Sequence, residues 1–148
     1  MFFTEQYTFD GGSVGISALA TANGKISHAF VPTLTLGIMC NALVCLSSWM
    51  CYSASTTVDR ILTIIPPVSA FVAAGFEHSI ANAHLISLAL FIKAGAADSF
   101  WASIGKTRAD FPALTWGNLF VSNLVPLTIG NIIGGSVMVA AAYWFVYL

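Results

Sequence analysis

The chain has 148 residues, of which 57% are hydrophobic and only 7% are charged, whereas a soluble domain carries about 25% charged residues. This composition, with a mean hydropathy of +0.85, indicates a membrane protein. The formal net charge of −1 excludes a basic face for nucleic acid, and the N-terminus lacks the basic start and apolar core of a signal peptide.

The first membrane span is predicted at about residues 29–50. Lys25 and Asp59 bracket 33 consecutive uncharged residues, and a spanning helix needs about 20 apolar residues. Residues 1–28 are predicted to be a polar or interfacial segment that leads into a membrane domain of residues 29–148.

Three cysteines, Cys40, Cys45 and Cys51, fall in this first apolar stretch. Their spacing matches neither a CxxC motif nor a set of metal ligands. We therefore interpret them as small apolar side chains rather than as a metal or redox site.

The second apolar stretch, about residues 59–93, is predicted to be a span broken near residues 75–82. The segment "AAGFEHSIAN" (73–82) places Glu77 and His78 inside an apolar run, between Gly75 and Asn82. We expect two half-helices, about 59–74 and 83–93, joined by a loop. Non-helical backbone at membrane depth must be buried in protein or line a wet cavity, and such breaks mark substrate sites in transporters.

The charged segment 93–114 is predicted to be an aqueous loop, with Phe100 and Trp101 at headgroup level. The last span is predicted at about residues 125–147, where Tyr143, Trp144 and Tyr147 would form an aromatic belt. Three spans without a second repeat suggest half of a larger protein.

The polar residues placed in the membrane are the candidate functional groups. Glu77 is interpreted as an acceptor that holds the loop, with proton transfer as the alternative. His78 is interpreted as functional because its unperturbed pKa lies nearest neutrality; a neutral, packed histidine is the alternative.

Two amides and two phenylalanines complete the set. Asn41 and Asn131 lie at mid-depth of the first and last predicted spans. Either amide could form hydrogen bonds between helices or line a pore, and the sequence does not favour one role over the other. Phe71 and Phe76 flank the Glu-His motif, and either core packing or a hydrophobic constriction fits them.

Three segments in this order, "LGIMCNALVCL" (36–46), "GFEHSIAN" (75–82) and "NLVPLTIGNIIGG" (123–135), resemble the formate/nitrite transporter family. The segments "KISH" (25–28) and "FWASIGKTRADF" (100–111) are most similar to its formate-channel branch. The resemblance covers about residues 24–148. It implies an all-α, membrane-helical fold: an aquaporin-like half-protomer with three spans, the middle one broken by a pore loop.

The family forms homo-pentamers of six-helix protomers in the lipid bilayer, and this chain resembles helices four to six. The pore threonine of the broken second helix would lie outside this sequence, so the chain alone is not expected to close a pore. The resemblance and the residues together imply pore or substrate-binding roles for His78, Asn131, Asn41, Phe71, Phe76 and Lys25, and a structural pore loop of Gly75, Glu77 and Asn82. His78 matches the central pore histidine, and Lys25 matches a lysine near the entrance.

The resulting prediction is a channel or transporter subunit for small monovalent anions, formate or nitrite, in the bacterial inner membrane. Proton exchange at His78 is part of this hypothesis, and neither a cofactor nor a metal is expected. One alternative is a truncated, inactive fragment of such a channel. Another is a membrane enzyme using Glu77 and His78, although HExxH and cofactor fingerprints are absent from the sequence.

The family orientation implies a cytoplasmic C-terminus. The loop that carries Lys93, Lys106 and Arg108 would then lie outside, although the positive-inside rule favours the reverse. Its charge is only +1, from three basic and two acidic residues, so the family orientation is followed.

Overall fold

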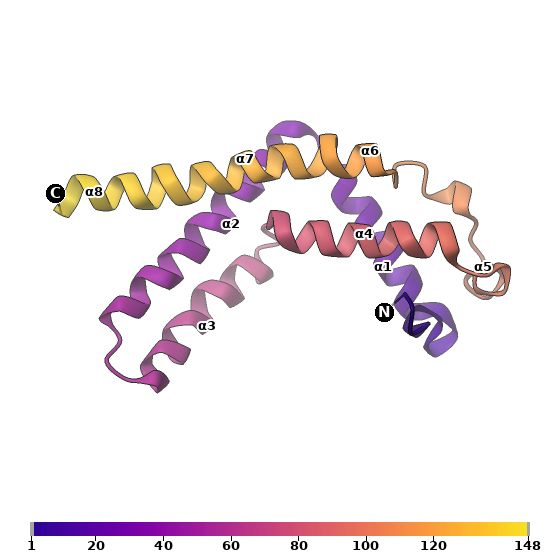
Figure 1. Cartoon of the computed structure of the whole chain (residues 1–148), viewed down its shortest axis with the longest axis horizontal. Helices are drawn as coiled ribbons and strands as arrows, with labels where there is room; N and C mark the ends of the chain where they lie inside the picture. The colour runs from indigo at the N-terminus through magenta and orange to yellow at the C-terminus, as the bar shows by residue number, and fades with distance from the viewer. Residues whose placement is uncertain (1, 148) are drawn as a thin grey trace. The chain divides into compact units, whose positions relative to one another are not determined.

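The computed structural model describes residues 2–147 and contains no strand within that range. The main helices are α1 (Ser13–Ile26), α2 (Phe30–Met50), α3 (Thr57–Ala73), α4 (Ser79–Gly95), α5 (Asp98–Ile104), α6 (Trp116–Asn118), α7 (Val125–Ile133) and α8 (Ala142–Tyr147) (Figure 1). Two π-helical segments, Leu119–Leu124 and Gly134–Ala141, join α6, α7 and α8 into one long helix. The predicted all-α class is confirmed.

The chain divides into two compact units. Unit 1 comprises Met1–Ala29 and Ile80–Leu124, and unit 2 comprises Phe30–Ser79 and Val125–Leu148. Each unit is built from segments that are distant in the sequence.

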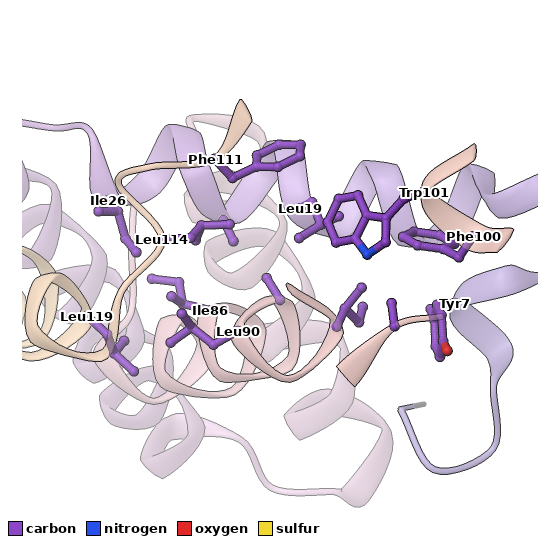
Figure 2. Packing of buried hydrophobic residues seen from close by; sticks show 14 residues of the cluster. Tyr7, Leu19, Ile26, Ile86, Leu90, Phe100, Trp101, Phe111, Leu114 and Leu119 are labelled. Atoms are coloured by element: carbon purple, nitrogen blue, oxygen red, sulfur yellow. The ribbon is translucent and has the colours of Figure 1, made fainter. Parts of the chain in front are cut away.

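The core of unit 1 gathers apolar side chains from α1, α4, α5 and the loop after α5 (Figure 2). Helix α1 was not predicted as a helix; Leu19, Ala22 and Ile26 form its buried face at helical spacing. Phe100 and Trp101 are only 3% and 6% exposed. They pack in this core, where the Phe100 ring meets Tyr7 edge to face at 5.1 Å, and their place at the headgroup level stays a prediction.

The charged segment of unit 1 is a compact loop held by its own basic residues. Lys93 Nζ donates hydrogen bonds to the carbonyls of Phe111 and Leu114, at 2.7 and 2.8 Å. Arg108 donates to the carbonyl of Ala96 at 2.8 Å. The backbone N–H of Thr107 donates to the Asp110 carboxylate at 2.7 Å, and this bond lowers the pKa of Asp110.

Unit 2 is organised by a close crossing of α2 and α7, beside which α3 packs on α2 (Figure 1). Gly130 and Gly134 lie directly on the backbone carbonyls of Leu34 and Ile38 of α2. A side chain at either glycine would push the helices apart, so glycine allows this approach.

At the far end of unit 2, Trp49 of α2 meets two tyrosines of α8. Its ring lies edge to face with Tyr143 at 5.4 Å and with Tyr147 at 6.3 Å. Of the three free cysteines in α2 and the turn after it, Cys40 is buried and the others are partly buried.

Two helices in the described residues are long and apolar enough to cross a membrane: Phe30–Ser53, of 24 residues, and Trp116–Tyr147, of 32 residues. The first contains α2, whose residues nearly coincide with the predicted span at 29–50; that it crosses the membrane stays a prediction. The last helix begins at Trp116 and not near residue 125, because the Thr115 side chain accepts a bond from the Asn118 N–H and so caps it.

Helices α3 and α4 have 17 residues each, fewer than the roughly 20 of a complete span. Helix α4 begins at Ser79, four residues earlier than the predicted second half-helix. A broken middle span made of α3 and α4 stays a prediction.

Candidate functional site

The helix break in unit 2 is a five-residue segment, 74–78, between α3 and α4. Gly75 has a left-handed backbone with φ of 70°. Its N–H donates to the Val72 carbonyl at 3.1 Å, and the Phe76 N–H donates to the Phe71 carbonyl at 3.0 Å. This pair of bonds is a Schellman motif, which ends a helix by satisfying its last carbonyls. The break is therefore narrower than the predicted 75–82.

Asn131 of α7 holds the chain on both sides of His78. Its Oδ1 accepts from the Ser79 N–H at 3.0 Å, and its Nδ2 donates to the Glu77 carbonyl at 3.4 Å. The same Nδ2 donates to the Gly37 carbonyl of α2 at 2.9 Å. One buried amide, 6% exposed, thus joins α7, α2 and both neighbours of His78.

Asn41 adds a second tie between the same helices. Its Nδ2 donates to the backbone carbonyl of Asn131 at 2.6 Å. The sequence left Asn41 either to bond between helices or to line a pore, and this hydrogen bond is of the interhelical kind. Asn41 is only partly buried.

His78 is partly buried, whereas the adjacent Glu77 is only 3% exposed. An imidazole can donate, accept and exchange a proton near neutral pH. Its backbone neighbours Glu77 and Ser79 are both bonded to Asn131, so the loop that carries the histidine is tied to α7 on both sides.

The structure brings most of the predicted site residues together in unit 2, namely His78, Asn131, Asn41, Phe71, Phe76, Gly75 and Glu77. Lys25 and Asn82 belong to unit 1. Asn82 is not part of a loop, because it lies inside α4, is 2% exposed and donates to Asn123 Oδ1 at 3.1 Å. Its predicted place in the pore loop is wrong: the helix restarts at Ser79.

The sequence missed three positions, two at this site in unit 2 and one, Asn123, in unit 1. Ser79 and Gly37 act through backbone groups, which any residue carries, so no side-chain pattern identifies them. Gly37 also leaves room for the Leu127 carbonyl, which would lie 2.8 Å from an added Cβ. Asn123, a buried amide in an apolar helix, was the one detectable signal.

Comparison with known proteins gives a consistent result. The sequence profile of the family described as formate/nitrite transporter matches residues 1–145, so the resemblance extends upstream of residue 24. The formate channel FocA of Escherichia coli K12 is 41% identical over 148 residues, which are 100% of this chain and 52% of that protein. The formate channel FocB of the same strain is 43% identical over 134 residues, 90% of this chain and 48% of that protein.

A solved structure described as a pentameric formate channel with formate bound superposes with a TM-score of 0.94 at 44% identity. It covers 99% of this chain, and the match spans 58% of that structure's chain. The chain spans about half the length of the curated relatives it matches. With a family profile matched along nearly its whole length, the chain belongs to the formate/nitrite transporter family.

Proposed function

We propose that the complete protein is a homo-pentameric channel or transporter for formate in the bacterial inner membrane, to which this chain contributes half of each pore. The formate channels among its relatives support the substrate class. The observation that carries the proposal is the placement of His78 in a helix break whose two sides are bonded to Asn131. Ionisable side chains at membrane depth are rare and mark substrate or ion pathways, which supports a role for His78 in binding the anion.

In this proposal His78 contacts the anion. Asn131, Asn41, Glu77 and Gly75 hold the loop, and Phe71 and Phe76 narrow the passage. Lys25 attracts anions at the entrance, since a cation there raises their local concentration.

Proton exchange at His78 is the finer part of the proposal. A bare anion is costly in an apolar passage, and formate is a weak acid that crosses such a passage more readily when neutral. A protonated imidazole would attract the anion and could then transfer its proton. Nitrite is a small monovalent anion of the same kind, and the site would accept it on the same grounds.

The experiment is formate flux into proteoliposomes that contain the complete protein, measured between about pH 5 and 8, where histidine titrates. His78→Asn keeps a hydrogen-bonding side chain and removes the titratable one, so it should flatten the pH profile. His84→Asn, the same change at an exposed position of α4, should leave the profile unchanged. A wild-type profile in a folded, pentameric His78→Asn protein would refute the role of His78.

The fragment hypothesis needs a separate measurement. The 148-residue chain alone should give no flux, and co-expression with an N-terminal half should restore it. Flux from the chain alone would contradict the half-pore proposal. The enzyme alternative has no support from the relatives, whose names describe channels and transporters.

A further inference from the structure

A second polar network lies inside unit 1, apart from the residues around His78. It consists of Asn82, Asn123 and the backbone carbonyl of Lys25, which we call the amide chain. Asn82 Nδ2 donates to Asn123 Oδ1 at 3.1 Å, and Asn123 Nδ2 donates to the Lys25 carbonyl at 3.1 Å. Asn123 is completely buried and Asn82 is 2% exposed.

The amide chain connects three elements at one point: α4, the π-helical segment Leu119–Leu124, and the end of α1. A π segment accommodates an additional residue in the helix, and one residue turns a helix by about 100°. The side chains that follow therefore face a different direction from those of an uninterrupted α-helix. Apolar residues would be the ordinary choice for such a buried place, since an amide there must find partners.

Lys25 is the next-to-last residue of α1. The last carbonyls of a helix can accept bonds from donors outside the helix. Asn123 supplies a donor to the Lys25 carbonyl from another element and so fixes the last turn of α1.

We propose that Asn123 is a positioning residue that sets where the Lys25 ammonium is presented, with Asn82 orienting Asn123. Lys25 is partly buried, so the path of its backbone determines where its Nζ emerges. It is also the only lysine or arginine before Arg60, so no neighbouring cation in that part of the sequence replaces it. The proposal rests on the proposed function, in which Lys25 attracts anions at the entrance.

A double-mutant cycle in the complete protein tests the proposal. Initial formate flux would be measured in proteoliposomes at low and high ionic strength for Lys25→Gln, Asn123→Ala and the double variant. Lys25→Gln should lower flux at low salt and weaken its dependence on salt, because salt screens charge attraction. Asn123→Ala should lower flux by about threefold with Lys25 present and cause no further loss with Lys25→Gln, as expected for coupled residues.

Asn118→Ala is the matched control. Asn118 lies in the first turn of the same long helix, and its Nδ2 donates to the Ala113 carbonyl, not to α1. Its loss should not change the salt dependence of flux. Asn82→Ala, which leaves the Asn123 bond to Lys25 in place, should have a smaller effect than Asn123→Ala.

A labelling measurement keeps the two proposals separable. In a pentameric protein with Cys40, Cys45 and Cys51 replaced by alanine, a thiol introduced by Lys25→Cys would be modified by a charged reagent. Adding Asn123→Ala should change the modification rate about threefold, whereas adding Asn118→Ala should not.

An unchanged modification rate, or an equal loss of flux in the Lys25 and Lys25→Gln backgrounds, would overturn the positioning role of Asn123. If Lys25→Gln leaves formate flux and its salt dependence unchanged while Asn123→Ala still changes the modification rate, the entrance role of Lys25 fails and the positioning role of Asn123 stands.

Discussion

Asn131 illustrates how a single side chain acquires its role from its partners. An asparagine amide has two N–H donors and one carbonyl acceptor, and all three interact with backbone: Gly37 and Glu77 accept, and Ser79 donates. A group engaged in this way stabilises the loop around His78. Whether it also contacts the anion, as the sequence predicts, is not tested by these bonds.

Gly75 is the residue at which the helix break depends on backbone freedom. Gly75→Ala should destabilise the complete protein by about 1 kcal/mol, because its φ of 70° is unfavourable for a residue with a Cβ. Thermal unfolding in detergent measures the change.

Gly24→Ala is the control for this prediction. Neither glycine has an atom within 4 Å of an added Cβ, but only Gly75 has a positive φ. Alanine in helix α1 should be neutral or stabilising. Equal destabilisation by both substitutions would contradict the argument from φ.

At the scale of elements, the crossing of α2 and α7 carries the site. It brings Asn131 to Gly37 and Asn41 to the Asn131 carbonyl, and Gly130 and Gly134 allow the backbones to approach. A wider separation of these two helices would break both amide bonds. The stability of this helix pair and the geometry around His78 are therefore linked.

Gly134→Val tests this link. The new side chain would overlap the Ile38 carbonyl, and overpacking of this kind costs about 1–3 kcal/mol. We expect a lower unfolding temperature and a lower yield of pentamer. Gly117→Val, on the same long helix but with no atom within 4 Å of its added Cβ, should be much milder; a comparable loss there would point to helix propensity as the cause.

At the scale of the whole molecule, large apolar side chains remain exposed on both units. On α3 alone, more than 50% of Val58, Ile61, Leu62, Ile65 and Val72 is exposed. Apolar surface of this extent marks contact with lipid or with other protein. Both are expected under the proposed function, in which the bilayer, the other half of the protomer and its neighbours cover these faces.

The orientation of the complete protein is a prediction at this scale. We expect Arg60, before the middle of α3, to face the cytoplasm and Lys106, after α5, to face the outside. Arg60→Cys and Lys106→Cys in a cysteine-free background should differ in labelling by an impermeant reagent applied to intact cells. Only the thiol at position 106 should react, and reaction only at position 60 would reverse the topology.

By itself, the sequence determined the fold class of the protein and the place of its helix break. Long uncharged runs indicate membrane helices because charge is costly in the bilayer, and α2 ends at Met50 as predicted. The combination of glycine with a Glu-His pair located the helix break, and the role of His78 stays a prediction. These features are local, so composition and neighbouring residues suffice to find them.

Only the tertiary structure decided what the amides do. Asn131 and Gly37 are 94 positions apart, and Asn123 and Lys25 are 98 apart, so their pairing depends on how helices cross. The sequence placed Asn82 in a loop and left Asn41 and Asn131 between two roles, and it did not predict α1 or the π segments. An amide pattern reveals a need for partners, but the partners here are backbone groups that every residue offers, and only packing selects among them.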